Sequence, residues 1–178
     1  MKRVLLSLAM MSLGVSIAAG QASQVTKEKV EGIVNLSRVG TTVACAGAIT
    51  PASVAGIKKM GFASIINLRL PNEPGSDIAA EEAAAKAAGL KFVHIPMNST
   101  MPEAATADRF LRVIAEPTTE PAFIHCASGN RASALWLIKR VVIDKWDMAR
   151  AQEEAAALGL SSPVLKQFAA DYIKSVVK

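Results

Sequence analysis

Short runs of apolar residues alternate with longer segments of mixed polarity along most of the chain. The runs 43–49, 63–68, 90–95 and 122–125 are short, apolar and in part β-branched, which is typical of strands buried on both faces of a sheet. Segments of helical length separate these runs, and strands joined through helices favour parallel pairing. The pattern therefore predicts an α/β fold with a mostly parallel, four- to five-stranded sheet flanked by helices.

Helix start and stop residues divide the segments between these strands. Thr50 and Pro51 form a start signal for a helix that ends near Gly61, and Asp77 is placed to cap a helix that stops at Gly89. Residues 26–37 have the spacing of a short amphipathic helix. The expected helices are therefore 26–37, 51–61, 77–89, 103–116, 131–145 and two more that begin at Asp147 and Ser162.

The N-terminal segment has the pattern of an export signal. Lys2 and Arg3 precede an apolar run over 4–19 that only Ser and Gly interrupt, and small residues follow it. A run of about 16 residues is shorter than the roughly 20 that a spanning helix needs. We therefore predict a cleaved signal peptide over 1–22 and a single domain over 23–178, periplasmic or secreted, with no stable membrane insertion after cleavage.

Composition excludes several classes of protein. The chain has 178 residues, of which 51% are apolar and 20% charged, so it can close one core without staples. Two cysteines and two histidines are too few for a four-ligand zinc site, and we expect neither a metal nor a cofactor. The net charge of +5 includes no run of Lys and Arg, so nucleic acid is not an expected partner.

The segment 125–131 carries the chemistry that the sequence predicts. A buried strand ends at Cys126, a tight loop with Gly129 follows, and Arg131 opens an apolar helix. Loop N–H groups, the helix dipole and a guanidinium all favour a thiolate at such a position. The same N–H groups form a cradle for a tetrahedral anion, which Arg131 would clamp. The arrangement predicts a nucleophilic thiolate aimed at a bound oxyanion.

Structural roles are the alternatives for both cysteines. A buried thiol at a strand end is often only part of a core, which is the other interpretation of Cys126. In an oxidising compartment, Cys45 and Cys126 could form a disulfide, remain free thiols, or act as a reactive thiol with its resolving partner.

The order of these residues resembles a known group of enzymes. His125 and Cys126, with Gly129 and Arg131 after them, are similar to the phosphate loop of cysteine-dependent phosphatases of the dual-specificity and tyrosine phosphatase type. The stretches 47–51 and 61–69 resemble the bacterial branch called the β-lactamase hydrolase-like protein, phosphatase-like domain. The resemblance implies a cysteine-phosphatase-like fold and, as substrate, a phosphorylated small molecule or a phosphoprotein.

The resemblance also implies a role for each loop residue. Cys126 would form a cysteinyl-phosphate, Arg131 would hold the equatorial oxygens, and His125 would orient the loop and help to stabilise the thiolate. The phosphate-binding amides would be those of Ala127, Ser128, Gly129, Asn130 and Arg131. Arg69, at the end of a neighbouring strand, would either line the pocket rim or pair with Glu73.

Three departures from the phosphatase pattern keep other functions open. First, four residues separate Cys126 from Arg131, whereas the phosphatase pattern has five. A loop of this shorter length is similar to that of rhodanese-type sulfurtransferases, in which the cysteine would carry a persulfide. Ala132 stands where the phosphatase pattern has Ser or Thr, with Ser133 one step later. A catalytically weak oxyanion-binding module is the third possibility.

The third departure concerns the general acid. Asn98 stands where an Asp is expected, and an amide cannot donate a proton to a leaving alkoxide. Glu103 is the better placed of the carboxyl groups downstream.

Overall fold

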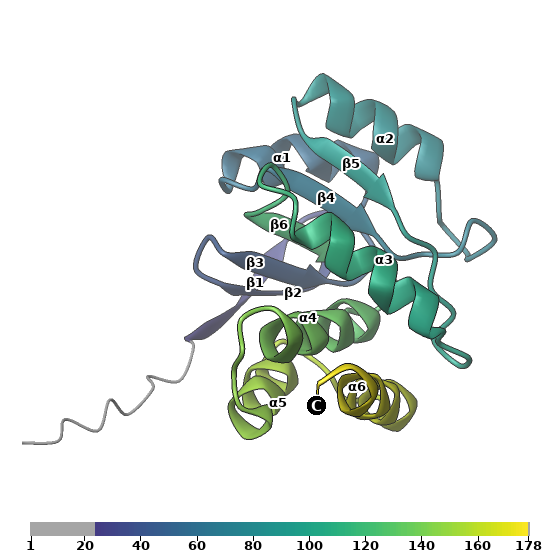
Figure 1. The fold of residues 1–178 in the computed structure, drawn as a ribbon. Coiled ribbons are helices and arrows are strands. Elements are labelled where there is room, and N and C mark those ends of the chain that lie inside the picture. The colour runs from purple at the N-terminus through teal and green to yellow at the C-terminus, as the bar shows by residue number, and fades with distance from the viewer. Residues whose placement is uncertain (1–23, 178) are drawn as a thin grey trace, which may run out of the picture.

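The computed structural model of the protein describes residues 24–177, so the predicted signal peptide over 1–22 lies outside the described residues. Six strands form one sheet in the order β1-β2-β3-β6-β4-β5 (Figure 1). The strands are β1 Val25–Val30, β2 Ile33–Val39, β3 Val43–Ala46, β4 Ser64–Asn67, β5 Lys91–His94 and β6 Ala122–His125. The last four in this list pair in parallel, which confirms the predicted α/β class and its mostly parallel sheet. The predicted number of four to five strands is wrong, because β1 and β2 bring the sheet to six.

Helices cover both faces of the sheet. They are η1 Pro51–Ser53, α1 Val54–Lys59, α2 Ile78–Ala87, α3 Ala104–Ile114, α4 Asn130–Val142, α5 Met148–Ala157 and α6 Pro163–Val176. The core on one face includes side chains from α3 to α6, and the core on the other includes side chains from α1 and α2. Helix α4 lies against the sheet, with α5 and α6 packed on it (Figure 1). None of the described helices is long and apolar enough to cross a membrane.

Three helix starts follow the sequence signals, whereas Thr50 precedes the 3-10 turn η1 without a capping hydrogen bond from its side chain. The side chain of Asp77 accepts a hydrogen bond from the N–H of Ala80 at the start of α2. Asp147 and Ser162 cap α5 and α6 in the same way. These three predicted caps are confirmed, because each side-chain oxygen satisfies an N–H that has no partner within its helix.

The predicted helix over 26–37 is wrong, because this segment forms the antiparallel hairpin of β1 and β2. Gly32 makes the turn with a φ of +74°, where a Cβ would lie 2.5 Å from Oγ1 of Thr50. Strand β2 pairs with β3, so the hairpin extends the parallel sheet by two antiparallel strands. The spacing of apolar residues in this segment favours a helix, but the pairing of β1 with β2 and of β2 with β3 makes it part of the sheet.

Candidate active site

The Cys126 loop joins the central strand β6 to helix α4. Gly129 precedes the first helical residue and adopts a φ of +100°, which a residue with a side chain rarely reaches. Its N–H donates a hydrogen bond to Sγ of Cys126 over 3.1 Å. Cys126 is buried, at only 1% exposure, and its sulfur lies beside Gly129, the N-cap residue of α4. A hydrogen bond donated to sulfur is the kind of contact that favours a thiolate over a thiol.

Carbonyl groups on the outer side of this loop are bound to the neighbouring chain segments. The carbonyl of Ala127 accepts from the N–H of Ala48 over 3.1 Å, and that of Ser128 accepts from Nδ2 of Asn35 over 3.3 Å. A peptide N–H points away from the carbonyl of its own unit, so the N–H groups that follow face the inside of the loop. A Cβ at Gly47 would lie 2.8 Å from the carbonyl oxygen of Ala127, so glycine allows this close approach.

Asn130 contributes to the site through a neighbouring loop. Its Oδ1 accepts hydrogen bonds from the N–H groups of Ser161 and Ser162, each over 2.8 Å. The side chain therefore attaches the start of α4 to the start of α6. Its backbone N–H remains one of the predicted phosphate-binding amides at the helix N-terminus.

The guanidinium of Arg131 is held by three groups from two other loops. Nη1 donates to the carbonyl of Leu68 over 3.0 Å and to that of Met97 over 2.8 Å. Nη1 and Nη2 also bind the two carboxylate oxygens of Glu73, over 2.5 and 2.8 Å. None of these hydrogen bonds uses Nε. The guanidinium also interacts with the thiol of Cys126, which contributes to the raised pKa of Arg131, so an anion bound beside Cys126 lies within reach of the fork.

Glu73 is the counter-charge of Arg131. Burial by itself raises the pKa of this carboxyl, but hydrogen bonds from Arg131 and from the N–H of Leu70, with the charge of Arg131, lower it from 4.5 to about 2. The carboxylate in turn contributes to a raised pKa of Arg131, against the effect of burial. Glu73 is therefore ionised at neutral pH and cannot serve as a proton donor.

Arg69 holds the loop that carries Glu73. Its Nε lies 3.3 Å from the carboxylate of Glu73, and its two Nη atoms donate to the carbonyls of Pro74 and Gly75 over 2.5 and 2.9 Å. The side chain is buried, at 3% exposure. Of the two predicted roles, the structure shows the pairing with Glu73, with Arg69 inside its own loop.

His125 lies among buried polar groups. Its Nε2 is 3.1 Å from Oε2 of Glu81, and neither ring nitrogen makes a hydrogen bond with a described residue. The same Oε2 accepts from Nδ2 of Asn67 over 2.6 Å. Neither Asn67 nor Glu81 was predicted as part of the site. In the sequence, Glu81 stands beside Glu82 in an Ala-rich segment, and no local signal separates the buried carboxyl from the exposed one.

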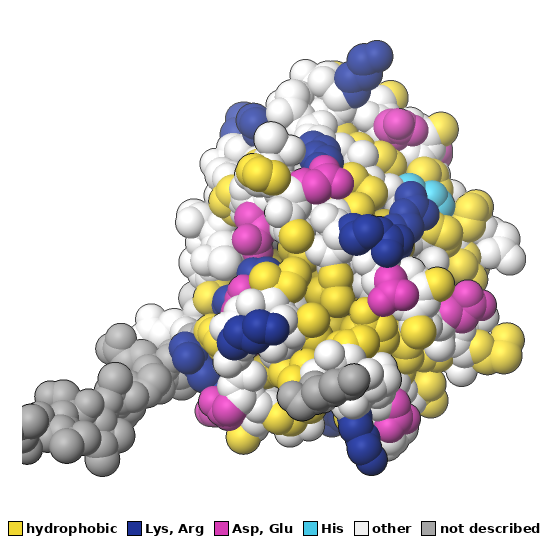
Figure 2. Space-filling model, in the orientation of Figure 1, with side chains coloured by type: hydrophobic (Ala, Val, Ile, Leu, Met, Phe, Trp, Pro, Cys, Tyr) yellow, Lys and Arg dark blue, Asp and Glu magenta, His cyan; other side chains and the backbone are white. Residues whose placement is uncertain are grey.

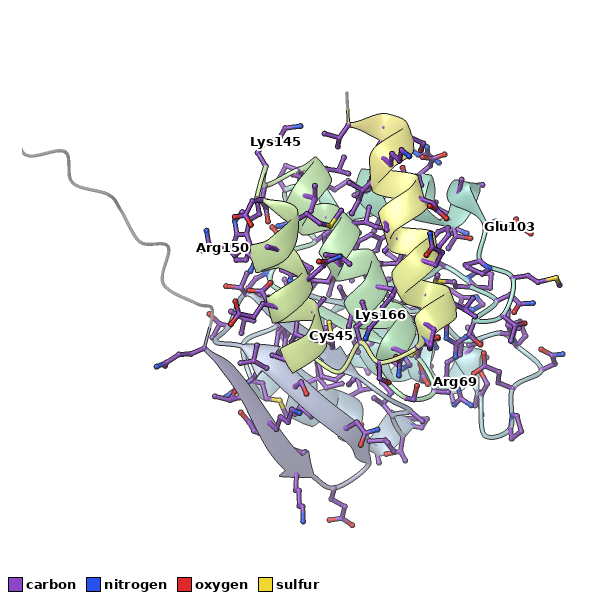
Figure 3. All side chains as sticks on the ribbon, turned by 90° about the horizontal axis from the view of Figure 1, so that it is seen from below. Cys45, Arg69, Glu103, Lys145, Arg150 and Lys166 are labelled. Atoms are coloured by element: carbon purple, nitrogen blue, oxygen red, sulfur yellow. The ribbon has the colours of Figure 1, made fainter. Side chains whose placement is uncertain are left out.

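Ser133 and Cys45 lie behind the loop. The hydroxyl of Ser133 lies 3.1 Å from the carbonyl oxygens of both Gly129 and Leu158, which share its one proton as acceptors, and it also interacts with Cys45. Burial raises the pKa of the Cys45 thiol, a hydrogen bond with Ser133 opposes the rise, and the nearby charge of Cys126 adds to it. Figure 3 shows Cys45 among the helices in the interior. Ser133 therefore supports the turn into α4.

The two cysteines are free thiols. Cys45 lies opposite Ile124 in the register of β3 and β6, and Cys126 is two residues further along. Two residues of strand and one strand spacing separate the Cα atoms by about 8 Å, whereas disulfides span up to about 6.8 Å. A disulfide would require the loop to move.

Asn98 and Glu103 lie in the loop between β5 and α3. Oδ1 of Asn98 accepts from the N–H and hydroxyl of Thr100, both over 2.9 Å, and from the N–H of Met101 over 3.2 Å. Asn98 therefore forms the turn. Glu103 takes the N-cap position of α3 without a capping bond, and its side chain projects away from the body of the protein (Figure 3). The structure brings neither side chain into contact with Cys126.

No cluster of three or more His, Cys, Asp and Glu side chains suited to a metal ion occurs between residues 24 and 177. A groove of about 760 Å³ adjoins the loop on the side of the hairpin. Its walls include Ser128 and Asn130 together with residues of β1, β2 and the segment before α6.

Comparison with known families agrees with this geometry. The family model described as "Beta-lactamase hydrolase-like protein, phosphatase-like domain" matches residues 35–143. A beta-lactamase hydrolase-like protein of Xylella fastidiosa is 41% identical over 106 residues, which cover 57% of this chain and 23% of that protein. The namesake from Agrobacterium fabrum is 32% identical over 105 residues, which cover 57% and 24%. The match thus spans about a quarter of the length of these relatives.

Solved structures share the fold. TpbA of P. aeruginosa superposes with a TM-score of 0.63 at 21% identity, over 88% of this chain and 91% of that chain. TpbA is also known in complex with pTyr. The core catalytic domain of the PP-IP phosphatase SIW14 of S. cerevisiae superposes with a TM-score of 0.62 at 18% identity, over 79% and 89%. These similarities confirm the predicted cysteine-phosphatase-like fold.

Proposed function

Because the chain belongs to the family of beta-lactamase hydrolase-like protein, phosphatase-like domains, we propose that it hydrolyses a phosphate monoester through Cys126. The observation that carries the proposal is the N–H of Gly129 on Sγ of Cys126, at the start of α4. A sulfur in this position combines a stabilised charge with a cradle of amides for the phosphoryl oxygens. The chain would be an exported enzyme, periplasmic or secreted, acting on a phosphorylated small molecule or a phosphoprotein.

The reaction would take two steps. The thiolate of Cys126 attacks phosphorus, and the bond to the leaving oxygen breaks with its electron pair on that oxygen. Water then attacks the cysteinyl-phosphate, which releases phosphate and restores the thiolate. The loop amides and the guanidinium of Arg131 would stabilise the equatorial oxygens in both steps.

The leaving group would depart without strong protein assistance. Asn98 is committed to its turn, Glu73 is ionised beside Arg131, and Glu103 projects outward. A general acid contributes roughly 10²–10⁴-fold. We therefore expect aryl phosphates to react at least about 100-fold faster than alkyl phosphates.

The test is release of phosphate from an aryl phosphate by the purified protein. Cys126→Ser and Arg131→Ala should each abolish release, whereas Glu82→Gln, an exposed change on α2, should leave the rate as in wild type. Equal rates in wild type and Cys126→Ser would refute the proposal.

Sulfur transfer is the second candidate, and the loop length favours it. Only four residues separate Cys126 from Arg131. In this reaction the thiolate attacks the outer sulfur of thiosulfate, sulfite leaves with the electron pair, and Cys126 carries a persulfide. Because sulfite is a stable anion, the step needs no general acid. A mass gain of about 32 Da on Cys126 after incubation with thiosulfate, and thiocyanate formation once cyanide is added, would support this candidate over hydrolysis.

A further inference from the structure

The loops around Cys126 carry little positive charge. They follow the carboxyl ends of β3, β4, β5 and β6, which meet at one edge of the sheet. Together with the segment before α6 and the first turn of α4, they contain two basic and three acidic residues: Arg69, Arg131, Glu73, Asp77 and Glu103. The loops that would receive a substrate therefore carry a small net negative charge.

The positive charges of Arg69 and Arg131 are both paired with the carboxylate of Glu73. Arg69 is buried and uses its guanidinium on Glu73 and on backbone carbonyls of its own loop. Arg131 shares the carboxylate of Glu73 through both Nη atoms. Because this carboxylate remains charged at neutral pH, an anion beside Cys126 meets one guanidinium whose charge is largely balanced, and it depends mostly on loop amides.

Uncharged side chains form the outer part of this edge. Asn72 and Thr100 are exposed, and Met101 is the most exposed large apolar side chain described, at 71%. The loop tips at the right-hand edge of Figure 2 are mostly apolar or uncharged. Lys27 and Lys29 line the separate groove on the side of the hairpin, together with Glu31 and with Glu28, which pairs with Arg38.

From this charge distribution we propose that the site binds one tetrahedral oxyanion of low charge, carried on an uncharged or apolar group, and gains little affinity from further phosphates on the same substrate. The inference deepens the proposed function and rests on the same site. On the side of the loops after β4 and β5, a second phosphate would meet no basic side chain other than the paired Arg69 and Arg131, and Glu73 and Glu103 would repel it. The apolar surface at Met101 instead suits an aromatic or aliphatic leaving group.

Binding of two anions that cannot be hydrolysed tests the proposal. Isothermal titration of the wild-type protein with sulfate and with inositol hexakissulfate measures one oxyanion against six on a single ring. We expect the two dissociation constants to agree within about tenfold. This margin covers the statistical advantage of six equivalent sulfate groups on one ring and the weak, salt-screened attraction of the ring to distant cations. Binding of the hexakissulfate more than about tenfold tighter than sulfate would overturn the inference.

Adding charge at the rim provides a second measurement. Asn72→Lys places a cation on an exposed loop tip, with Asn72→Gln as the matched uncharged control. We expect the lysine variant to tighten the hexakissulfate by at least about threefold and sulfate by less than about twofold, and the glutamine variant to change neither. No tightening in the lysine variant would also overturn the inference.

The outcome separates this inference from the proposed function. If sulfate binds with the expected ratio but no aryl phosphate is hydrolysed, hydrolysis is refuted while the weak gain from further anionic groups stands. If aryl phosphate is hydrolysed but the hexakissulfate binds far more tightly, that weak gain is refuted while the phosphatase proposal stands.

Discussion

Neutralising Glu73 tests how strongly the counter-charge of Arg131 stabilises the protein. The fall in its pKa from 4.5 to about 2 corresponds to about 3 kcal/mol by linkage. Its side chain is still 19% exposed, and solvent screening reduces the effect. We expect Glu73→Gln to lower the free energy of unfolding by about 2 kcal/mol at neutral pH.

The loss should depend on pH in one direction. Because folding lowers this pKa, the carboxylate stabilises the protein fully above about pH 4.5, and the effect disappears as the pH falls toward about 2. Urea unfolding, followed by fluorescence of the buried Trp136, should show wild type and Glu73→Gln converging in acid. Glu116→Gln, which removes an exposed partner of Lys91, should cost less than about 1 kcal/mol. A difference between wild type and Glu73→Gln that stays constant from neutral to acid pH would refute the reasoning.

Three other perturbations have expected outcomes. Gly47→Ala should displace the Cys126 loop, destabilise the protein by about 1–3 kcal/mol and lower activity. Gly56→Ala is the control: a Cβ there meets open space, so it should stabilise α1 by about 0.5–1 kcal/mol. Similar effects of the two substitutions on stability would contradict the geometry. Glu81→Ala should cost about 1–3 kcal/mol in urea unfolding because it leaves the buried Nδ2 of Asn67 without its partner, and the exposed Glu82→Ala should stay within about 0.5 kcal/mol. Cys45 should resist iodoacetamide in the native protein and react after denaturation, as read by mass spectrometry; labelling of native Cys45 would show that it is accessible or ionised.

The parallel part of the sheet and its helices were predictable from local patterns. Short apolar runs bounded by caps such as Asp77 and Ser162 specify buried strands and helix starts within the chain itself. The hairpin of β1 and β2 was not predictable in this way. Its polar and apolar residues suit a helix locally, and only pairing with β3 at the edge of the sheet makes it a strand.

By itself, the sequence determined where Cys126, Gly129 and Arg131 lie relative to a strand end and a helix start, because that spacing is local and the helix dipole acts within one turn. Only the tertiary structure decided which groups hold them. Glu73 reaches Arg131 across 58 residues of chain, and Asn35 reaches the loop across 93. Such contacts depend on strand order and loop closure, which no local pattern specifies.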